Sequence, residues 1–222
     1  MTENNTSLFI TLEGGEGVGK STVIAALADF FKAQRGDDSV VVSREPGATS
    51  LGATLRSLIL APSDDEVSDR ATLFLFLADR AQHITELVRP ALAEGKVVIL
   101  DRFIDSTQVY QTLNTDISED DIKYLSSWAA SDTIPDITFV LDGDPKTMLE
   151  RTSTTEFGTL DKFESKGLEF HEKVREGYRK VASENPERCI LVDAHQNKDE
   201  LLDTILGHIV ERFLDENPES TG

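Results

Sequence analysis

Short apolar runs recur along the chain, separated by longer segments of mixed polarity. The runs are rich in Val, Ile, Leu or Phe and lack the strict polar–apolar alternation of a strand with one solvent face. Continuous apolar runs of this length are typical of strands buried on both faces of a parallel sheet. The pattern therefore predicts five buried strands, at residues 7–13, 39–43, 96–101, 136–142 and 188–193.

The intervening segments are long enough to be the crossover helices that parallel strands require. These helices are expected at residues 20–35, 50–60, 70–94, 118–131, 144–151, 163–184 and 198–214. Five parallel strands with helices on both faces form a three-layer α/β fold, whose ligands bind beyond the carboxyl ends of the strands. The chain has 222 residues, enough for one such domain. We expect that domain at 8–214, between a flexible N-terminus (1–7) and a flexible acidic tail (215–222).

Composition narrows the class of protein. The chain carries 41 Asp and Glu against 22 Lys and Arg, a net charge of −19, which argues against a nucleic-acid partner. Cys189 is the only cysteine, so no intramolecular disulfide forms, as expected in a reducing cytoplasm. The start MTENNTS lacks the features of a signal peptide, and no apolar run approaches the about 20 residues of a membrane span. We expect a cytoplasmic protein with no membrane partner.

A glycine-rich stretch, EGGEGVGKST at 13–22, directly follows the first apolar run. Gly14, four further residues and then Gly19-Lys20-Ser21 match the phosphate-binding loop G-x-x-x-x-G-K-[ST]. In such a loop the backbone amides cradle phosphates, the lysine reaches the β- and γ-phosphates, and the Ser hydroxyl binds Mg²⁺. A glycine-rich turn without a ligand is the alternative. The position between a strand and a helix favours the phosphate loop, and with it a P-loop NTPase fold.

A carboxylate for the metal is expected at a neighbouring strand end. The run VVILDRF ends in Asp101, the position of the second nucleotide motif in this superfamily. The alternative role for a strand-end aspartate is to cap the next segment.

Three more stretches place arginines and an aromatic ring at the same edge. They are SREPGATSLG with Arg44, LFLADRAQH with Phe76 and Arg80 one helical turn apart, and DRFIDSTQVYQ with Arg102, Thr107, Tyr110 and Gln111. Guanidinium groups bind phosphate as forks and an aromatic ring stacks on a base, so the set suits a nucleoside monophosphate. Taken alone, Phe76 also suits the core and Arg80 a helix surface.

At this point the sequence resembles the thymidylate kinase family. EGGEGVGKST, REPGATSLG, LFLADRAQH, DRFIDSTQVYQ, PDITFVLDGDP and DKFE…FHEKVREGY occur in the order and spacing of that family, over residues 8 to about 180. The resemblance implies a dTMP kinase that transfers the γ-phosphoryl group of MgATP to dTMP, giving dTDP and ADP in dTTP biosynthesis. It also implies a homodimer and a short lid at about 152–162.

Site residues follow from the same resemblance. ATP and its phosphates would be bound by Gly14, Gly15, Glu16, Gly17, Val18, Gly19, Lys20, Ser21, Thr22 and Arg151. Mg²⁺ would be bound by Ser21 and, through water, by Asp101. The residues implied to act in catalysis are Lys20, Arg102, Asp101, Lys162 and Glu16.

The resemblance likewise implies the acceptor site. Arg44 and Arg102 would hold the dTMP phosphate, and Glu16 would contact the 3′-hydroxyl of the sugar, where a 2′-substituent would crowd Phe103. The base would be bound by Phe76, which stacks on thymine, by Arg80 and Thr107 at its polar edge, and by Gln111 nearby.

Several positions depart from the family pattern. Ala48 replaces a common glycine, and Phe103 stands where tyrosine is common. Relatives supply an arginine to the transferring phosphoryl from the phosphate loop or the lid, but here the loop position is Gly17. The segment RTSTTEFGTLDKFE offers Lys162 as the replacement cation, with Arg151 nearer the adenine or the phosphates.

Two other functions stay open from sequence alone. One is a related kinase acting on dUMP, dCMP or a nucleoside. The other is a nucleotide-dependent switch, because QNKDE at 196–200 resembles a guanine-specifying pattern, although Asn197 and Glu200 also fit a helix capping box. Tyr124 and Trp128, one helical turn apart, are expected in the core or in a subunit contact.

Overall fold

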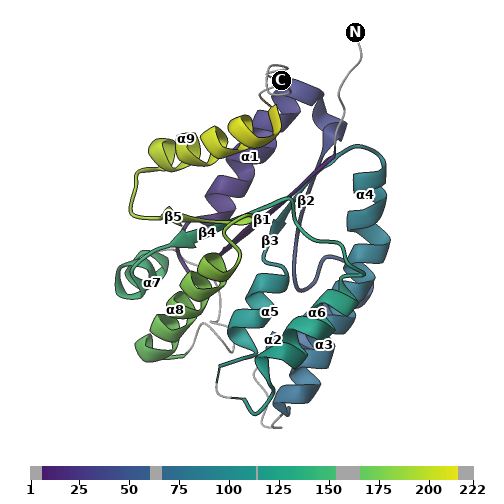
Figure 1. Ribbon diagram of the computed structural model, residues 1–222, viewed down its shortest axis with the longest axis vertical. Coiled ribbons are helices and arrows are strands. Elements are labelled where there is room, and N and C mark those ends of the chain that lie inside the picture. The colour runs from purple at the N-terminus through teal and green to yellow at the C-terminus, as the bar shows by residue number, and fades with distance from the viewer. Residues whose placement is uncertain (1–6, 61–66, 114, 154–165, 215–222) are drawn as a thin grey trace, which may run out of the picture.

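The computed structural model describes residues 7–60, 67–113, 115–153 and 166–214, apart from the side chains of 151–153. Its sheet has five parallel strands, which confirms the sequence prediction, and their order is β2-β3-β1-β4-β5 (Figure 1). The strands are β1 (Leu8–Gly14), β2 (Val40–Arg44), β3 (Val97–Asp101), β4 (Ile137–Asp142) and β5 (Cys189–Asp193). All five carboxyl ends therefore lie along one edge of the sheet.

Helices cover both faces of this sheet. Along the chain they are α1 (Lys20–Arg35), η1 (Asp37–Ser39), α2 (Ser50–Leu60), α3 (Asp69–His83), η2 (Ile84–Val88), α4 (Arg89–Ala93), α5 (Ile104–Tyr110), α6 (Glu119–Ala129), α7 (Pro145–Ser153), α8 (Leu168–Glu184), α9 (Lys198–Ile209) and η3 (Val210–Leu214). Figure 1 shows α1 and α9 together on one side of the sheet, and α3, α5, α6 and α8 on the other. Among the described helices, none is both long and apolar enough to span a membrane.

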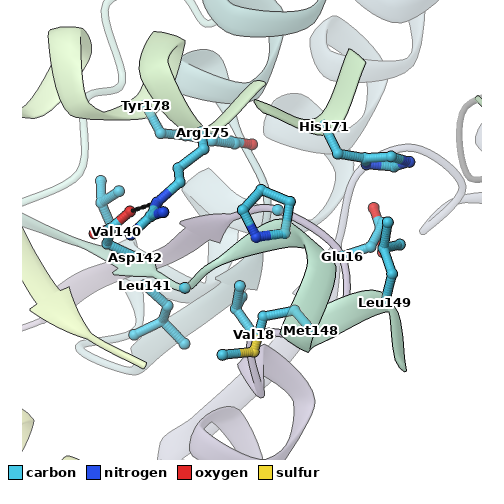
Figure 2. A pocket seen from close by; sticks show the side chains of 13 residues that line it. Glu16, Val18, Val140, Leu141, Asp142, Met148, Leu149, His171, Arg175 and Tyr178 are labelled. Atoms are coloured by element: carbon cyan, nitrogen blue, oxygen red, sulfur yellow. Dashed lines mark hydrogen bonds and ion pairs between the residues drawn. The ribbon is translucent and has the colours of Figure 1, made fainter. Parts of the chain in front are cut away.

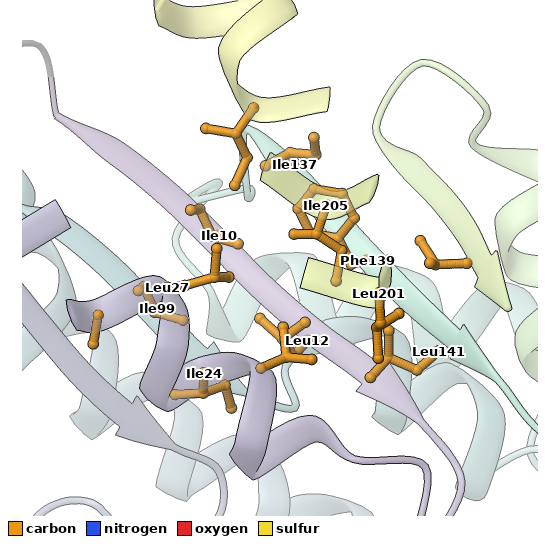
Figure 3. Packing of buried hydrophobic residues seen from close by; sticks show 14 of the residues in the cluster. Ile10, Leu12, Ile24, Leu27, Ile99, Ile137, Phe139, Leu141, Leu201 and Ile205 are labelled. Carbon is orange, nitrogen blue, oxygen red and sulfur yellow. The ribbon is translucent and has the colours of Figure 1, made fainter. Parts of the chain in front are cut away.

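Alternation along β1 assigns its side chains to the two faces. Ile10 and Leu12 pack with Leu27 of α1 and Ile205 of α9 in the largest core cluster (Figure 3). The intervening residues point the other way, because successive side chains of a strand alternate. Glu13, which is fully buried, therefore lies on the face covered by α5 and α8.

Most expected helices are present, and one was missed. The segment predicted at 70–94 is helical from α3 through η2 to α4. Ser118 caps α6 and Asn197 caps α9 through their side chains. For QNKDE, the structure thus has the helix cap at Asn197 that was the alternative to a guanine-specifying pattern. Helix α5 was not expected. Its first amides bond to the carboxylate of Glu13 on β1, a cap that is invisible in the local sequence.

Tyr124 and Trp128 are 70% and 73% exposed, so the core assignment was wrong and only a subunit contact is left. The tail at 215–222, residues 1–6 of the N-terminus, residues 154–162 of the lid and the start of the helix expected at 163–184 lie outside the described residues.

Candidate active site

The carboxyl ends of three neighbouring strands, β2, β3 and β1, bring the expected phosphate-binding groups together. Parallel pairing places Asp101 at the end of β3 opposite both Leu12 of β1 and Arg44 of β2. The phosphate loop follows β1 directly, and Arg102 follows β3. Arg44 is exposed, so its guanidinium is accessible to an anion at this edge.

The phosphate loop depends on glycine at its two ends. Gly14 has φ 130°, and a Cβ there would lie 2.5 Å from the carbonyl oxygen of Leu141 on β4. Gly19, with φ 95°, precedes the first residue of α1. Both conformations strain any residue with a side chain. The two glycines of the sequence motif are therefore needed for the backbone conformation of the loop. With this conformation, the amino end of α1 follows the loop directly, where its amides can bind an anion.

Lys20 is folded into this loop. Its Nζ donates to the carbonyl oxygens of Gly14 at 3.2 Å and Gly15 at 2.8 Å, and the residue is only 7% exposed. Burial, and next the charge of Arg102, lower the pKa of Lys20. A buried ammonium with neutral acceptors and a cationic neighbour is suited to bind an anion, because an anion would stabilise its charge.

Glu16 has Arg102 as its partner. The Nη2 of Arg102 lies 2.5 Å from Oε1 of Glu16 across the loop. Burial acts to raise the pKa of Glu16, but Arg102 and Lys20 outweigh it and lower that pKa to about 2. Glu16 is thus ionised. In the expected contact, its carboxylate would accept a hydrogen bond from the sugar hydroxyl while it is also bonded to Arg102.

Arg102 is held from several sides. Its φ of 68° is unusual for a residue with a side chain, and its amide donates to Leu12 O at 3.0 Å. Its Nη1 donates to Gly14 O at 3.1 Å and to the hydroxyl of Tyr178 at 2.8 Å. The guanidinium also lies 5.2 Å from the ring centroid of Tyr110. This arrangement fixes the direction of the guanidinium before any ligand arrives.

Arg80 and Thr107 meet in a second, buried cluster. Nη2 of Arg80 donates to Thr107 Oγ1 at 2.9 Å, and Nε donates to Oε2 of Glu45 at 2.9 Å. The Nη1 donates to Ser126 at 2.7 Å, and His83 Nδ1 lies 3.0 Å from the other oxygen of Glu45. The sequence interpretation put Arg80 and Thr107 at one site, and they are in direct contact.

Phe103 has a different environment from the one expected. It is fully buried, with its ring 5.0 Å below the guanidinium of Arg80 and 5.3 Å from the ring of Phe9. The predicted contact with a sugar substituent would require this side chain to move, and it stays a prediction. The amide of Phe103 donates to Oε1 of Glu13, and its ring packs in a core cluster with Phe9 and Leu100.

Asp101 fits a cation site. Its Oδ1 is buried and has no hydrogen-bond partner among the described residues. A buried carboxyl oxygen without a partner is costly unless a cation or water satisfies it. Ser21, in the first turn of α1, is exposed and can supply a hydroxyl. Carboxylate and hydroxyl oxygens suit Mg²⁺, which commonly keeps several waters.

A pocket lies between the phosphate loop and helices α7 and α8 (Figure 2). Its lining comes from the loop, the end of β4, α7 and α8: Gly15, Glu16, Val18, Val140, Leu141, Asp142, Gly143, Pro145, Met148, Leu149, His171, Arg175 and Tyr178. Asp142 pairs with Arg175 at 2.6 Å and with Arg179 at 2.6 Å. The Nε2 of His171 is buried and has no partner within the described part of the chain. Figure 2 shows His171 and Glu16 at the same side of the pocket.

Sequence reasoning missed the buried groups that form hydrogen bonds to the expected site residues and fix their positions. Glu45 accepts from Arg80, Tyr178 accepts from Arg102, and Glu13 accepts from the amide that follows Arg102; all three lie within stretches named above, but none was given a role there. One signal was available on α8. His171, Arg175 and Arg179 recur every four residues in FHEKVREGYR and so lie on one helical face.

The other expected site residues have these positions. Phe76 is half-buried on α3, Gln111 is buried just after α5, and Thr22 is exposed on α1. Lys162 and the side chain of Arg151 lie outside the described residues.

Comparisons with known proteins agree with this geometry. A family model of thymidylate kinase matches residues 12–205. Thymidylate kinases from Desulfovibrio desulfuricans and Desulforapulum autotrophicum are each 44% identical to the chain, over 88% of it and 91% of the first relative, and over 93% of it and 92% of the second. The crystal structure of thymidylate kinase from Ehrlichia chaffeensis has a TM-score of 0.73 at 31% identity, over 91% of this chain and 98% of that one.

Proposed function

The chain belongs to the thymidylate kinase family and is a dTMP kinase, and from this premise we propose how its residues transfer the γ-phosphoryl group of ATP to dTMP. One observation carries the assignment of roles. The phosphate loop, with Lys20 buried in it, is joined by the Glu16–Arg102 ion pair to the strand end that bears Asp101. A donor site and an acceptor site therefore share one edge of the sheet, with cations between them.

On the donor side, the loop from Gly14 to Thr22 binds the phosphates of ATP. The amides of the loop and the first turn of α1 face the phosphates, and Lys20 exchanges its bonds to backbone carbonyls for bonds to phosphate oxygens. Water-excluded cations and amides stabilise the charge that spreads over the transferring group. Arg151 would lie near the adenine or the phosphates.

On the acceptor side, Arg102 and Arg44 hold the phosphate of dTMP in line with the donor. Phe76 stacks on thymine, and Arg80 with Thr107 and Gln111 reads its polar edge. The buried bonds of Arg80 to Glu45 and Ser126 support this role, because they fix the guanidinium and, among the described residues, leave one N–H of Nη1 for the base. Glu16 contacts the sugar hydroxyl while it remains paired with Arg102.

Mg²⁺ would be held by Ser21 and, through water, by Asp101, whose unpartnered buried oxygen suits it. A bound divalent cation supplies charge neutralisation and orientation of the phosphates. The protein itself needs no general base, because the acceptor oxygen of dTMP is already anionic near pH 7, given a second phosphate pKa of about 6. Catalysis then rests on positioning and charge.

The lid at 152–162 would exclude water, which competes as an acceptor. We propose Lys162 as the cation that replaces the usual arginine at the transferring phosphoryl. Lys162→Ala should then lower kcat by a larger factor than it changes the KM for ATP or the KM for dTMP. An unchanged kcat would show that Lys162 does not act in the transfer.

ADP release by the purified protein tests the acceptor. With MgATP we expect turnover with dTMP, weaker turnover with dUMP, and almost none with dGMP or with no acceptor, while dCMP and UMP measure how strictly the base and the sugar are selected. Thr107 and Phe76 provide a site for a pyrimidine, which is the basis for expecting dTMP and dUMP to react and dGMP not to. Equal ADP release without an acceptor, or turnover only with another monophosphate, would overturn the roles of Phe76, Arg80 and Thr107.

We also propose that two copies of the chain form a homodimer. Large apolar side chains are exposed on three neighbouring helices: Leu51 and Leu58 on α2, Phe74 on α3, and Tyr124 and Trp128 on α6. Helices α2 and α3 pack together, as do α3 and α6, so these side chains can form one surface. Trp128→Glu should shift the protein to the monomer in light scattering after size exclusion, and a wild-type monomer at the same concentration would contradict the dimer.

The domain extends over 8–214 in this proposal, and its compartment is the cytoplasm, as the single and buried Cys189 supports. Recovery of the protein in the periplasmic or membrane fraction of cells would contradict that location.

A further inference from the structure

Glu13 is a buried carboxyl that no step of the transfer uses. It is 0% exposed, and its two oxygens have different partners. Oε1 accepts from the amides of Phe103 at 2.7 Å and Ser106 at 3.3 Å. Oε2 lies 2.7 Å from Ser106 Oγ and 3.0 Å from the hydroxyl of Tyr178. One oxygen thus acts as a carbonyl, and the other lies between two hydroxyl groups.

Those hydroxyl groups also contact each other. Ser106 Oγ and Tyr178 Oη are 2.8 Å apart, so three oxygens form a closed triangle. Three hydrogen bonds around the triangle require three hydrogens, and the two hydroxyl groups supply only two. Arg102 Nη1 donates from outside the triangle to the oxygens of Tyr178 at 2.8 Å and of Ser106 at 3.3 Å, so it supplies no hydrogen between the three oxygens. A protonated Glu13 would supply the third hydrogen.

We infer that Glu13 is a neutral carboxylic acid in the folded enzyme, and that its hydrogen-bonded ring with Ser106 and Tyr178 positions Arg102 for the acceptor phosphate. The effect on the phosphate rests on the proposed function of Arg102, whereas the protonation of Glu13 does not. Glu13 contacts both the backbone next to Arg102 and the partner of its side chain. It accepts from the amide of Phe103, which follows Arg102, and it bonds to Tyr178, which accepts from the guanidinium.

The surroundings favour the neutral form. Burial raises the pKa of Glu13 to about 7, and Asp105 adds to the shift. Charged and titratable groups face Glu13 from each element packed against it: Lys20 on α1, Arg102, Asp105 and Tyr110 after β3, Tyr178 on α8, and Arg188 and Cys189 at the start of β5. Of these, Asp105 is bound by both terminal nitrogens of Arg188, at 2.7 and 2.8 Å.

A neutral Glu13 also serves the site. An ionised carboxylate behind Arg102 would compete with the acceptor phosphate for its charge. Like charges disfavour each other, so a bound phosphate favours protonated Glu13, and ionisation of Glu13 weakens phosphate binding. The KM for dTMP should therefore rise as the pH increases above about 7, where Glu13 loses its proton.

The protonation state can be measured without any substrate. In protein labelled with ¹³C at the glutamate carboxyl carbons, we expect one resonance, absent in Glu13→Gln, that titrates near pH 7. Glu176→Gln, a change on the exposed face of α8, should remove a different resonance and leave the titrating one in place. Titration of the Glu13 resonance at or below about 4.3, the value of a glutamate in a model peptide, would overturn the inference.

Positioning is tested by kinetics. Tyr178→Phe and Ser106→Ala should each raise the KM for dTMP by up to about tenfold, the effect of losing one hydrogen bond, while the KM for ATP changes less than about twofold. In Glu13→Gln the rise of the KM for dTMP above pH 7 should disappear. The exposed Tyr124→Phe is the matched control and should leave both constants unchanged.

The outcomes separate the two levels of inference. Equal changes in both KM values, or a Glu13→Gln pH profile like that of the wild type, would overturn the positioning role, and thermal unfolding identifies any variant that is merely misfolded. If the wild type shows no turnover with dTMP, the proposed function fails, and the carboxyl titration still decides the protonation of Glu13.

Discussion

Replacing Arg102 with lysine is expected to lower kcat/KM for dTMP by about 10²-fold or more, the effect of losing one preorganised charged donor at a phosphoryl-transfer site. The guanidinium bonds in two directions at once. Its Nη2 binds Glu16, and its Nη1 binds Tyr178 and the carbonyl of Gly14. A lysine ammonium is a point charge without a planar fork, so it cannot keep these bonds and also bind a phosphate. Steady-state rates with dTMP varied at saturating ATP measure the loss.

Arg179→Lys is the matched control for that experiment. Arg179 also pairs with a carboxylate, Asp142, but its side chain is 49% exposed and belongs to neither proposed binding site. Its substitution should change kcat/KM by less than about twofold, as expected for an exposed ion pair. If Arg102→Lys behaved like Arg179→Lys, Arg102 would not be the group that binds the acceptor phosphate.

Lys20→Met should lower kcat by about 10²–10³-fold and leave the KM for dTMP nearly unchanged, because Lys20 acts on the donor phosphates. The same substitution should keep or raise the thermal midpoint of the ligand-free protein. Lys20 is buried and bonded only to neutral carbonyls in the contacts described, and burial lowers its pKa, so its charge costs stability in the absence of ATP. Methionine has a similar shape and carries no such cost.

Steady-state rates and calorimetry on Lys20→Met, with the exposed Lys198→Met as control, check both parts. A kcat within about tenfold of the wild type would contradict the donor role. A large fall in the thermal midpoint would show that Lys20 stabilises the ligand-free fold, contrary to the interpretation of its buried charge.

Local patterns in the sequence were sufficient for the framework. Five apolar runs predicted the five strands, and EGGEGVGKST predicted a loop whose ends need glycine, as the angles at Gly14 and Gly19 confirm. These features are readable because they depend on neighbouring residues: burial on both faces of a strand, a left-handed backbone angle, the start of a helix. The approximate positions of Arg44, Asp101 and Arg102 followed, since parallel strands share one carboxyl edge.

Contacts between distant residues were beyond such patterns. Glu16 and Arg102 are separated by 86 positions, and Glu13 and Tyr178 by 165. The sequence analysis also did not predict the cap of α5 by Glu13. It did not predict that Phe103 is buried and that Trp128 is exposed.

The physical reason is that a strand pattern specifies burial but neither strand order nor register. The order β2-β3-β1-β4-β5 places β1 between β3 and β4, and the alternation of β1 turns Glu13 toward α5 and α8. The sequence by itself determined the strands, the phosphate loop and the chemical class of the site. Only the tertiary structure decided which carboxylates hold the arginines, because those pairs form when strands far apart in the chain pack side by side.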